Sequence, residues 1–422
     1  MSNLKTVILA AGKGTRMKSE ISKVLHKIFD KELVAYVIDA VKNLSDENYV
    51  IVGHQADKVK EFVKKYSDKS ICLLQEPQLG TGDAVNKAYN NLENFDGEVL
   101  VLCGDTPLIR EKTLKDFITS HKENKAQLSV MSAIFEDPTG YGRIIRDEND
   151  NLKMIVEQKD ATDTQKAVKE VNTGIYCLDW QAIKGAFKDL KCNNSQGEYY
   201  LTDIVSWAVN KGLRVKSYIL DDNREIFGIN SKSNLAQATK FLNERTLEDL
   251  MAKGVTIVDP DKVMISPETE IQADTTILPY VYITGKNKIG KNCKIGPFSH
   301  LRGNVVLGDN VRVGNFVEVK NSTIKSNTNV SHLSYIGDSD LGSGVNIGAG
   351  TITANYNPIT KVKSRTVIKD GANTGSNSVL VAPVEMGEKS MLAAGSIATK
   401  DIDNNALVLT RAQQRTIENW VK

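Results

Sequence analysis

The sequence predicts an α/β domain with a mostly parallel sheet, followed by a parallel β-helix of six-residue repeats. Three observations support this prediction. Apolar strand-like runs alternate with helix-like periods through the first half of the chain. Aliphatic residues recur at every sixth position through most of the second half. One helical stretch, Ser231–Lys253, separates the two patterns. At 422 residues, the chain is long enough for two or three domains.

The first half alternates strands with helices. The expected strands are Thr6–Leu9, Tyr49–Val52, Ile71–Gln75 and Glu98–Cys103, and the expected helices are Leu33–Leu44, Val59–Tyr66 and Thr81–Leu92. The strand runs are nearly continuously apolar, which is typical of parallel strands covered by helices on both faces. Ligands of such sheets bind beyond the carboxyl ends of the strands. We therefore expect the ligand-binding residues at those ends.

A glycine-containing turn follows the first strand. In the segment Leu9–Met17, small residues let a backbone pass close to a ligand. Backbone N–H groups between a strand and a helix form a concavity that suits phosphate oxygens, and Lys13, Arg16 and Lys23 add positive charge. The spacing matches neither a Walker A loop nor a dinucleotide fingerprint. The turn alone is equally compatible with phosphate binding and with a tight turn that binds nothing.

Two further strand ends carry polar residues. Gln75 shortly precedes Gly80 and Gly82, and its amide offers the donor and the acceptor that the edge of a base requires. Asp105 follows the next strand. One carboxylate completed by water and phosphate oxygens is a typical magnesium arrangement, although a lone Asp there is more often a helix cap or a turn residue. Three such ends in one sheet favour a ligand site.

Later strand-like runs of the first half are also flanked by polar residues. The loop Asp137–Arg143 contains two glycines, and Glu157 and Asn172 lie beside apolar runs. Both side chains are suited to hydrogen-bond sugar hydroxyls. Ordinary turn residues explain the composition of these segments equally well.

The stretch Ser231–Lys253 predicts one long helix with an apolar stripe. Beyond it, aliphatic residues recur with a period of six, which is the period of neither a helix nor an alternating strand. The predicted inward positions are Ile265, Ile271, Ile277, Ile283, Ile289, Ile295, Leu301, Leu307, Val313, Val319, Ile324, Val330, Ile336, Leu341, Ile347, Ile368, Leu380, Met386, Leu392 and Ala398. With three hexads in each coil, the repeat predicts roughly seven coils of a parallel β-helix.

The repeat slips near Lys320 and Tyr335 and is interrupted at Thr353–Arg365, where polar residues concentrate. His332 lies two positions after an inward valine, so it is not expected in the core. Most exposed histidines only face solvent, but one set among Arg, Lys and Tyr residues can act as a general base. A purely structural β-helix remains the alternative.

Composition narrows the classes of partner. The net charge of +2 gives no general attraction to nucleic acid or to an anionic membrane. We find no apolar run long enough to span a bilayer and no signal-peptide pattern. The five cysteines show no spacing typical of zinc sites or of a disulfide framework. We therefore expect a cytoplasmic protein that binds neither nucleic acid nor membrane.

The first-half motifs resemble those of sugar-nucleotide pyrophosphorylases, nucleotidyltransferases with a modified, Rossmann-like dinucleotide-binding fold. The resemblance rests on Leu9–Met17 with Lys23, Gln75 with Gly80-Thr81, Gly104-Asp105, Thr139–Arg143, Glu157, Asn172–Gly174, Gly197–Asp203 and Phe227–Asn230. It implies that Asp105 and Asn230 together hold Mg²⁺.

The second half extends the resemblance to one bacterial family. Its members are bifunctional N-acetylglucosamine-1-phosphate uridyltransferases and glucosamine-1-phosphate acetyltransferases. The motifs are Arg302, Gly314–Lys320, His332–Asp338, Asn346–Gly350, Asn355-Tyr356, Ser376 and Arg411. The resemblance covers nearly the whole chain. It implies a left-handed β-helix, a homotrimer, and ligand sites between subunits.

The resemblance implies two reactions on small molecules. Acetyl-CoA acetylates glucosamine 1-phosphate in the β-helix, and the resulting N-acetylglucosamine 1-phosphate then reacts with UTP in the first domain, releasing pyrophosphate. The domains expected are residues 1–230 for uridyl transfer, residues 231–254 as a linker helix, and residues 255–422 for the acetyltransferase β-helix and a C-terminal tail.

Site residues follow from the same resemblance. The catalytic residues implied are His332, Arg16 and Lys23. Those implied to bind the uridyltransferase substrates are Leu9, Ala10, Ala11, Gly12, Lys23, Gln75, Gly80, Thr81, Cys103, Gly104, Asp105, Gly142, Glu157, Asn172 and Asn230. Those implied to bind the acetyl acceptor are Arg302, Lys320, Tyr335, Asn346, Asn355 and Tyr356, and those implied for acetyl-CoA are Ala349, Ser376, Ala394 and Arg411.

Two alternatives belong to other functional classes. One is a sugar-1-phosphate nucleotidyltransferase with a single activity, whose β-helix only trimerises or regulates. The other is a non-enzymatic β-helix scaffold joined to a vestigial nucleotide domain. His332 with Arg302 and Lys320 argues against the first, and Lys23 with Asp105 argues against the second.

Overall fold

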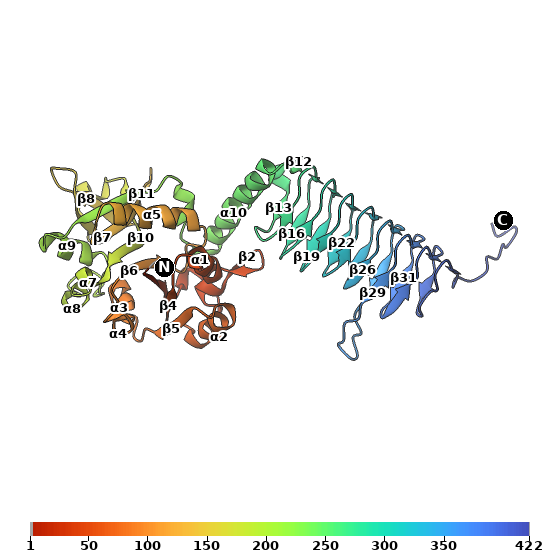
Figure 1. The fold of residues 1–422 in the computed structure, drawn as a ribbon, viewed down its shortest axis with the longest axis horizontal. Helices are drawn as coiled ribbons and strands as arrows, with labels where there is room; N and C mark the ends of the chain where they lie inside the picture. Colours follow the sequence, from red (N-terminus) through yellow and green to blue (C-terminus); the bar gives the residue numbers. More distant parts are fainter. Residues whose placement is uncertain (1–2, 422) are drawn as a thin grey trace. The chain divides into compact units, whose positions relative to one another are not determined.

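The computed structural model describes residues 3–421, and the chain divides into two compact units, Met1–Thr239 and Lys240–Lys422. Figure 1 shows an α/β unit built around one sheet and a β-helix of stacked coils. Each unit has hydrophobic core residues of its own. The two units are described separately below.

The sheet of the first unit has the order β11-β7-β10-β6-β1-β4-β5. Its strands are β1 Leu4–Ala10, β4 Glu47–Val52, β5 Ser70–Leu74, β6 Glu98–Cys103, β7 Leu128–Ile134, β10 Glu170–Asp179 and β11 Val215–Ile219. All pairings on this path are parallel except those of β10, which lies antiparallel between β6 and β7. The predicted mostly parallel sheet is confirmed. A hairpin of β8 Arg143–Arg146 and β9 Leu152–Val156 extends from β10.

Helices cover both faces of this sheet. They are α1 Leu33–Val41, α2 Ala56–Tyr66, α3 Thr81–Asn86, α4 Tyr89–Leu92, α5 Glu111–Glu123, α6 Asp163–Lys166, α7 Trp180–Ile183, α8 Ala186–Asp189 and α9 Asp203–Asn210. Successive residues of β1 point to opposite faces, so Val7 packs in one core and Ile8 in the other. The single helix predicted over Thr81–Leu92 is instead two helices, α3 and α4, with a break at residues 87–88.

Helix α10, Lys232–Ala252, matches the predicted long helix within one residue at each end. Near its start, the Lys232 Nζ atom lies 3.3 Å from Nδ1 of His26 in the first unit. Near its end, Leu247 and Leu250 join the core of the β-helix. The side chain of Asn243 donates to the carbonyl of Val263 at 2.8 Å and accepts from the N–H of Ile265 at 2.9 Å, so it caps the first coil.

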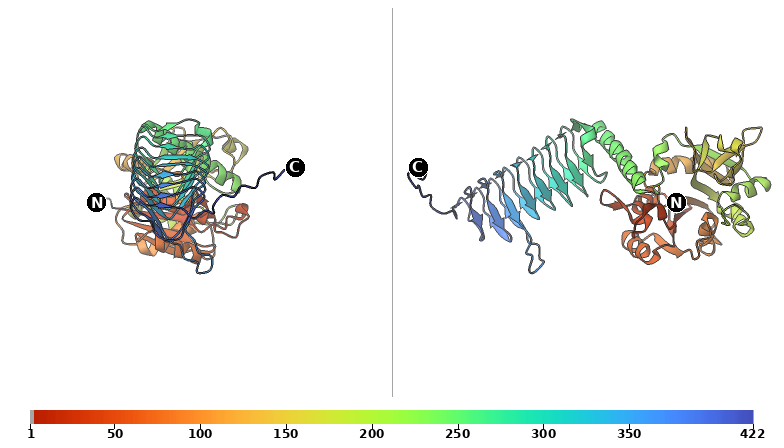
Figure 2. Two further views of the ribbon diagram at one scale, coloured as in Figure 1. Left: turned by 90° about the vertical axis from the view of Figure 1, so that its right-hand side faces the viewer. Right: turned by 180° about the vertical axis from the view of Figure 1, so that it is seen from behind.

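The second unit is a β-helix of three parallel sheets with nine, eight and seven strands. The first sheet contains β12 Thr256–Ile257, β15 Thr276–Ile277, β18 Lys294–Ile295, β21 Arg312–Asn315, β24 Asn329–His332, β27 Asn346–Ile347, β30 Asn373–Thr374, β33 Met391–Leu392 and β35 Leu407–Val408. The second contains β13 Met264–Ile265, β16 Tyr282–Thr284, β19 His300–Arg302, β22 Glu318–Lys320, β25 Tyr335–Gly337, β28 Ile352–Ala354, β31 Val379–Val381 and β34 Ile397–Ala398. The third contains β14 Glu270–Ile271, β17 Lys288–Ile289, β20 Val306–Leu307, β23 Thr323–Ile324, β26 Ser339–Leu341, β29 Thr366–Ile368 and β32 Val384–Met386. Figure 2 includes a view along the stack, in which the coils overlie one another.

Every predicted inward position is buried, at 5% exposure or less, so the hexad prediction is confirmed. The β-helix is slightly longer than the roughly seven coils expected, because it already begins with β12 and continues to β35. Ile257, in β12, was not predicted as an inward residue, because it lies eight positions before Ile265 and the repeat has a period of six. The interruption forms a projecting loop (Figure 1), in which the N–H of Ser364 bonds to the carbonyl of Asn355 at 2.9 Å.

Close stacking of the coils makes Gly314 a sensitive position. A Cβ atom added there would lie 1.9 Å from the carbonyl oxygen of Ser331 in the next coil. We expect Gly314→Ala to destabilise the β-helix by about 1–3 kcal/mol, because backbone must shift to relieve the clash. Thermal unfolding followed by circular dichroism measures this loss. Gly344→Asn is the matched control, because Gly344 has open space around it and a φ of +66° that Asn tolerates. An equal melting temperature for wild type and Gly314→Ala would contradict the prediction.

Candidate active sites of the two units

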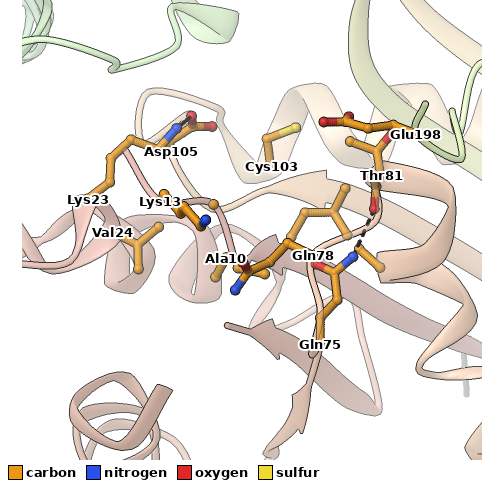
Figure 3. Close-up of a pocket in the computed structure, with 15 residues that line it drawn as sticks. Ala10, Lys13, Lys23, Val24, Gln75, Gln78, Thr81, Cys103, Asp105 and Glu198 are labelled. Atoms are coloured by element: carbon orange, nitrogen blue, oxygen red, sulfur yellow. Dashed lines mark hydrogen bonds and ion pairs between the residues drawn. The ribbon is translucent and has the colours of Figure 1, made fainter. Parts of the chain in front are cut away.

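A cavity of about 460 Å³ lies at the carboxyl ends of β1, β5 and β6. Figure 3 shows its lining side chains. Its walls are Leu9, Ala10, Ala11, Gly12, Lys13, Lys23, Val24, Gln75, Gln78, Gly80, Thr81, Ala84, Cys103, Asp105 and Glu198. The structure therefore brings the three predicted strand ends together around one space. Burial raises the pKa of the Cys103 thiol to about 12, so Cys103 contributes an uncharged group to the cavity wall.

Lys23 lies between two oxygen atoms from distant parts of the chain. Its ammonium forms an ion pair with the Asp105 carboxylate and lies 3.1 Å from Oδ1 of Asn230. Both carboxylate and ammonium are largely buried. The N–H of Ile229 bonds to the carbonyl of Asp105 at 3.0 Å, which holds the Asn230 segment beside β6. Two oxygens thus converge on one cationic position at the cavity wall.

The glycine turn allows Lys23 to reach this position. Gly14 has a φ of +59°, and a Cβ atom there would lie 2.7 Å from Cβ of Lys23. A side chain at residue 14 would therefore displace η2, the short helix Lys23–Leu25. Arg16 lies on η1, Thr15–Met17, with an exposed side chain that does not line the cavity. Of these two residues, which the resemblance grouped as catalytic, Lys23 lines the cavity and Arg16 does not.

Gln75 is almost completely buried at the other end of the cavity. Its amide nitrogen donates to the carbonyl oxygen of Gly80 at 2.9 Å and to Oδ2 of Asp83 at 2.8 Å. Gly80 has a φ of +112°, and a Cβ atom there would lie 2.6 Å from the carbonyl oxygen of Tyr199. Only glycine fits this close approach of the loop, which gives the amide of Gln75 one of its acceptors.

The remaining predicted residues of the first unit lie around the cavity without lining it. The N–H of Gly104 bonds to the carbonyl of Leu9 at 2.9 Å, which joins two strand ends. Oδ1 of Asn172 accepts from the N–H of Gly174, next to Cys103. Glu157 lines a second hollow of about 310 Å³ and accepts from Oγ1 of Thr202 at 3.3 Å. Burial raises the pKa of Glu157.

Gly142 lies beside the carboxylate of Glu157. A Cβ atom at Gly142 would lie 3.5 Å from both carboxylate oxygens of Glu157. This is an ordinary van der Waals distance, and the tightest neighbour of such a Cβ atom would be Cγ2 of Ile155, at 3.1 Å. Gly142 therefore lies in contact range of Glu157, next to the β8–β9 hairpin.

In the β-helix, the predicted acetyl-CoA residues and His332 form a column along one corner. The N–H of Gly350, next to Ala349, bonds to the carbonyl of His332 at 3.2 Å. In the next coils, Asn377 N–H bonds to the Ala349 carbonyl at 2.7 Å and Gly395 N–H bonds to the Ser376 carbonyl at 2.8 Å. The guanidinium of Arg411 then donates to the carbonyl of Ala394 at 2.7 Å. His332, Ala349, Ser376, Ala394 and Arg411 thus become neighbours along this corner.

The histidine of this column has a fixed tautomer. Nδ1 of His332 lies 2.9 Å from Oδ1 of Asn315 in the preceding coil. A carbonyl-type oxygen only accepts hydrogen bonds, so Nδ1 donates to Asn315, and in the neutral ring the lone pair is on Nε2. The imidazole is exposed. Asn315 therefore orients His332 so that Nε2 is the nitrogen left for a ligand.

Two predicted cationic residues lie in register on the second sheet. Arg302 of β19 pairs with Lys320 of β22, and Nε of Arg302 donates to Oε1 of Glu318 at 2.7 Å. Burial and the nearby ammonium of Lys363 lower the pKa of Lys320, and the charge of Arg302 lowers it further. Three cations in one place favour an anionic ligand such as a phosphate.

An acidic residue holds this cluster together. Although burial opposes ionisation of Asp338, hydrogen bonds from Asn321 and Asn355 and the charges of Lys320 and Lys363 lower its pKa. Nδ2 of Asn321 donates to Asp338 at 2.5 Å, and Asn355 also donates to its carboxylate. Asn355 is thereby fixed at the start of the projecting loop beside the cationic cluster.

The other acceptor-site residues differ in their placement. A Cβ atom at Gly337 would lie 2.3 Å from the Tyr335 hydroxyl, so the Tyr335 ring lies over Gly337, which is in register with Lys320. Tyr356 is 52% exposed and pairs with Lys363 across the loop. Asn346 is exposed on the first sheet, in register with Asn329. The structure joins Tyr335 to the cluster but leaves Asn346 apart from it within this chain.

Several residues that contribute to these sites were not among the predicted site residues. Within the described residues they are Asp83, Val24 and Lys363, together with Glu198, Asn315, Glu318 and Asp338, which lie within motifs of the resemblance. Asp338 offered a signal, because it immediately follows a repeat glycine at a slip of the hexad. Lys363 lay within the interruption that concentrated polar residues. Asp83 offered no signal in the sequence.

Within residues 3–421, no group of three or more His, Cys, Asp and Glu side chains could hold a metal ion. A magnesium ion held by one carboxylate, one amide oxygen and substrate phosphates needs no such group. The convergence of Asp105 and Asn230 on one cation fits this donor set. In the same range, no helix has the length and hydrophobicity needed to cross a bilayer.

The fold and the cavity define a transferase of two parts, a nucleotidyltransferase-type α/β unit and a hexapeptide-repeat β-helix. The nucleotidyl transferase family matches residues 5–243, and the bacterial transferase hexapeptide (six repeats) family matches residues 288–321. The fold class predicted from the sequence, including the left-handed β-helix, is confirmed.

Full-length relatives narrow this class. The bifunctional protein GlmU of Clostridioides difficile (strain 630) is 42% identical over 454 residues, covering 100% of this chain and 98% of the relative. The bifunctional protein GlmU of Shouchella clausii (strain KSM-K16) is 42% identical over 456 residues, covering 100% and 99%. The chain belongs to the bifunctional GlmU family. It is an enzyme with uridyltransferase and acetyltransferase activities, as the motifs predicted.

Proposed function

We propose that His332 is the general base of acetyl transfer to glucosamine 1-phosphate. Nε2 of His332 takes a proton from the amino group as its nitrogen attacks the thioester carbonyl of acetyl-CoA. The C–N bond forms, the C–S bond breaks, and the proton passes to the thiolate of coenzyme A. The observation that carries this proposal is the 2.9 Å contact with Asn315, which leaves Nε2 free to accept the proton.

The surrounding residues bind the two substrates. Arg302, Lys320 and Lys363 attract the sugar phosphate, and Asp338 limits their mutual repulsion. The corner column with Ala349, Ser376, Ala394 and Arg411 binds coenzyme A along the stack. Tyr335, Asn346, Asn355 and Tyr356 contact the sugar and the acetyl group.

The cavity of the first unit binds UTP and N-acetylglucosamine 1-phosphate. A phosphate oxygen of the sugar phosphate attacks the α-phosphorus of UTP, the new P–O bond forms, and pyrophosphate leaves. Lys23 and the backbone of Leu9–Gly12 stabilise the charge of the triphosphate. Arg16, exposed on η1, adds positive charge. Gln75, Gly80 and Thr81 contact uracil.

The sugar of the second substrate is held by the remaining polar residues. Glu157 and Asn172 hydrogen-bond its hydroxyl groups, and Gly142 lies next to Glu157. Cys103 and Gly104 form the floor beside β6. These contacts align the acceptor, which is the main requirement of phosphoryl-type transfer.

Asp105 and Asn230 would hold Mg²⁺, which would neutralise charge on the triphosphate when bound. Without Mg²⁺, the ammonium of Lys23 provides the positive charge beside the same two oxygens. We expect EDTA in excess to abolish uridyl transfer while acetyl transfer keeps its full rate, because no acetyltransferase residue proposed above binds a metal. Adding back Mg²⁺ should restore uridyl transfer. Uridyl transfer that continues in EDTA would contradict the magnesium assignment.

A homotrimer is the proposed assembly. Tyr280, Phe298 and Phe316 form a stacked ladder on one corner, with ring centroids 4.7 and 5.2 Å apart, and each ring is about half exposed. Such an apolar ladder is suited to contact between subunits. We expect light scattering to give three times the chain mass of 46.4 kDa. The mass of a single chain would contradict this assembly.

The decisive assay starts from glucosamine 1-phosphate, acetyl-CoA, UTP and Mg²⁺ and follows UDP-N-acetylglucosamine and free thiol. Both products should form, with thiol release preceding the nucleotide sugar. Absence of thiol release would refute the acetyltransferase mechanism. The five free cysteines and these metabolites support the cytoplasm as the compartment.

A further inference from the structure

We propose that Asp83 is a positioning residue that makes the base pocket selective for a pyrimidine with an imide N–H, such as uracil, over cytosine. Asp83 does so by fixing the side-chain amide of Gln75 in one orientation. This inference rests on the proposed role of Gln75 in contacting the base. It adds a specificity determinant that neither the motifs nor the family membership assigns.

The orientation of the Gln75 amide follows from its two partners. Its Nε2 atom lies 2.8 Å from Oδ2 of Asp83 and 2.9 Å from the carbonyl oxygen of Gly80. A carboxylate and a carbonyl both accept hydrogen bonds, so only the NH₂ group can face them. Turning the amide over would place Oε1 against two oxygens. Both hydrogens of the amide are therefore used within the protein.

The oxygen of the same amide is left for the ligand. Gln75 lines the cavity, and within residues 3–421 no donor contacts its Oε1 atom. Figure 3 shows the amide nitrogen of Gln75 joined by a dashed line toward the Gly80–Thr81 segment. Gln75 is only 3% exposed, so an oxygen that met no donor in the complex would be costly.

This acceptor distinguishes two pyrimidines. Uracil carries a hydrogen on N3 and can donate it to Oε1 of Gln75. Cytosine has a lone pair at N3, which would face the lone pairs of Oε1. A site built to bond one group rejects an analogue that lacks it far more strongly than an apolar pocket does. The fixed amide thus favours UTP over CTP.

Asp83 is itself held in place. It lies in the first turn of α3, and its Oδ1 atom forms an ion pair with Nζ of Lys87 at 3.1 Å. The two carboxylate oxygens thereby divide their roles, one bonding to Lys87 and the other to Gln75. The Asp83 side chain is 12% exposed, so solvent has little access to replace either contact.

Asp83→Asn tests the proposal, because the Asn amide can also donate, so that one of the two acceptors that orient the Gln75 amide is no longer fixed. We expect the ratio of kcat/KM for UTP to that for CTP to fall by about tenfold or more, through a higher KM for UTP and a lower KM for CTP. Asp83→Glu keeps an acceptor and should retain more of the wild-type ratio. The matched control is Asp116→Asn on the exposed face of α5, which should leave the ratio unchanged.

The acetyltransferase rate and the circular dichroism spectrum of each variant report on folding. If Asp83→Asn does not fold, Lys87→Met tests the same link and should lower the ratio by a smaller factor. An unchanged ratio in the folded Asp83→Asn enzyme overturns the role of Asp83. Wild-type enzyme that does not use UTP would instead overturn the proposed function, so the two failures are distinguishable.

Discussion

His332→Ala is expected to lower acetyl transfer by about 10²–10⁴-fold while uridyl transfer keeps nearly its wild-type rate. The loss is that of a positioned general base. The substitution removes Nε2, the ring nitrogen that is not engaged by Asn315. Release of free thiol from acetyl-CoA with glucosamine 1-phosphate measures the first activity. Pyrophosphate release with N-acetylglucosamine 1-phosphate and UTP measures the second.

Two further measurements make this expectation specific. Added imidazole should restore part of the thiol release in His332→Ala, because it can replace the missing base. Asn315→Leu keeps the imidazole but removes its acceptor, so it should lower the rate less than His332→Ala. Thiol release at the wild-type rate in His332→Ala would refute the assignment of the base.

Lys23→Ala is expected to slow uridyl transfer by about 10²–10³-fold and to leave acetyl transfer unchanged. The ammonium of Lys23 is largely buried at the cavity wall, where a charge stabilises a phosphoryl-transfer transition state most strongly. Its loss also leaves Asp105 and Asn230 without their shared partner. Initial rates of pyrophosphate release at saturating substrates measure the effect.

One arginine variant and one lysine variant serve as comparisons. Arg16 is exposed and does not line the cavity, so Arg16→Ala should cost less than Lys23→Ala. Lys58→Ala, on the exposed face of α2, is the matched control for loss of one positive charge. Equal losses of both activities in Lys23→Ala would contradict the picture of two separate sites.

In the first unit, the site residues at the ends of the strands could be predicted from the sequence. The glycine turn, Gln75 and Asp105 were expected at one edge of a parallel sheet, and the cavity joins them. The antiparallel insertion of β10 was not expected, because an apolar run does not reveal the direction of its partners. The contact between Asp83 and Gln75 depends on the irregular loop between β5 and α3, which has no periodic signal.

The β-helix and its core could be predicted from the sequence, because one aliphatic residue in six is a local pattern that each coil must bury. The polar interruptions and the family motifs were also found there. The contacts of Asp338 with Lys320 and Asn355 are seen only in the folded chain. The same holds for the corner shared by His332, Ala349, Ser376, Ala394 and Arg411. Which residues of successive coils stack on one another depends on the number of residues in every turn between them, including the slips and the projecting loop. Burial of a hexad, in contrast, depends on one aliphatic residue.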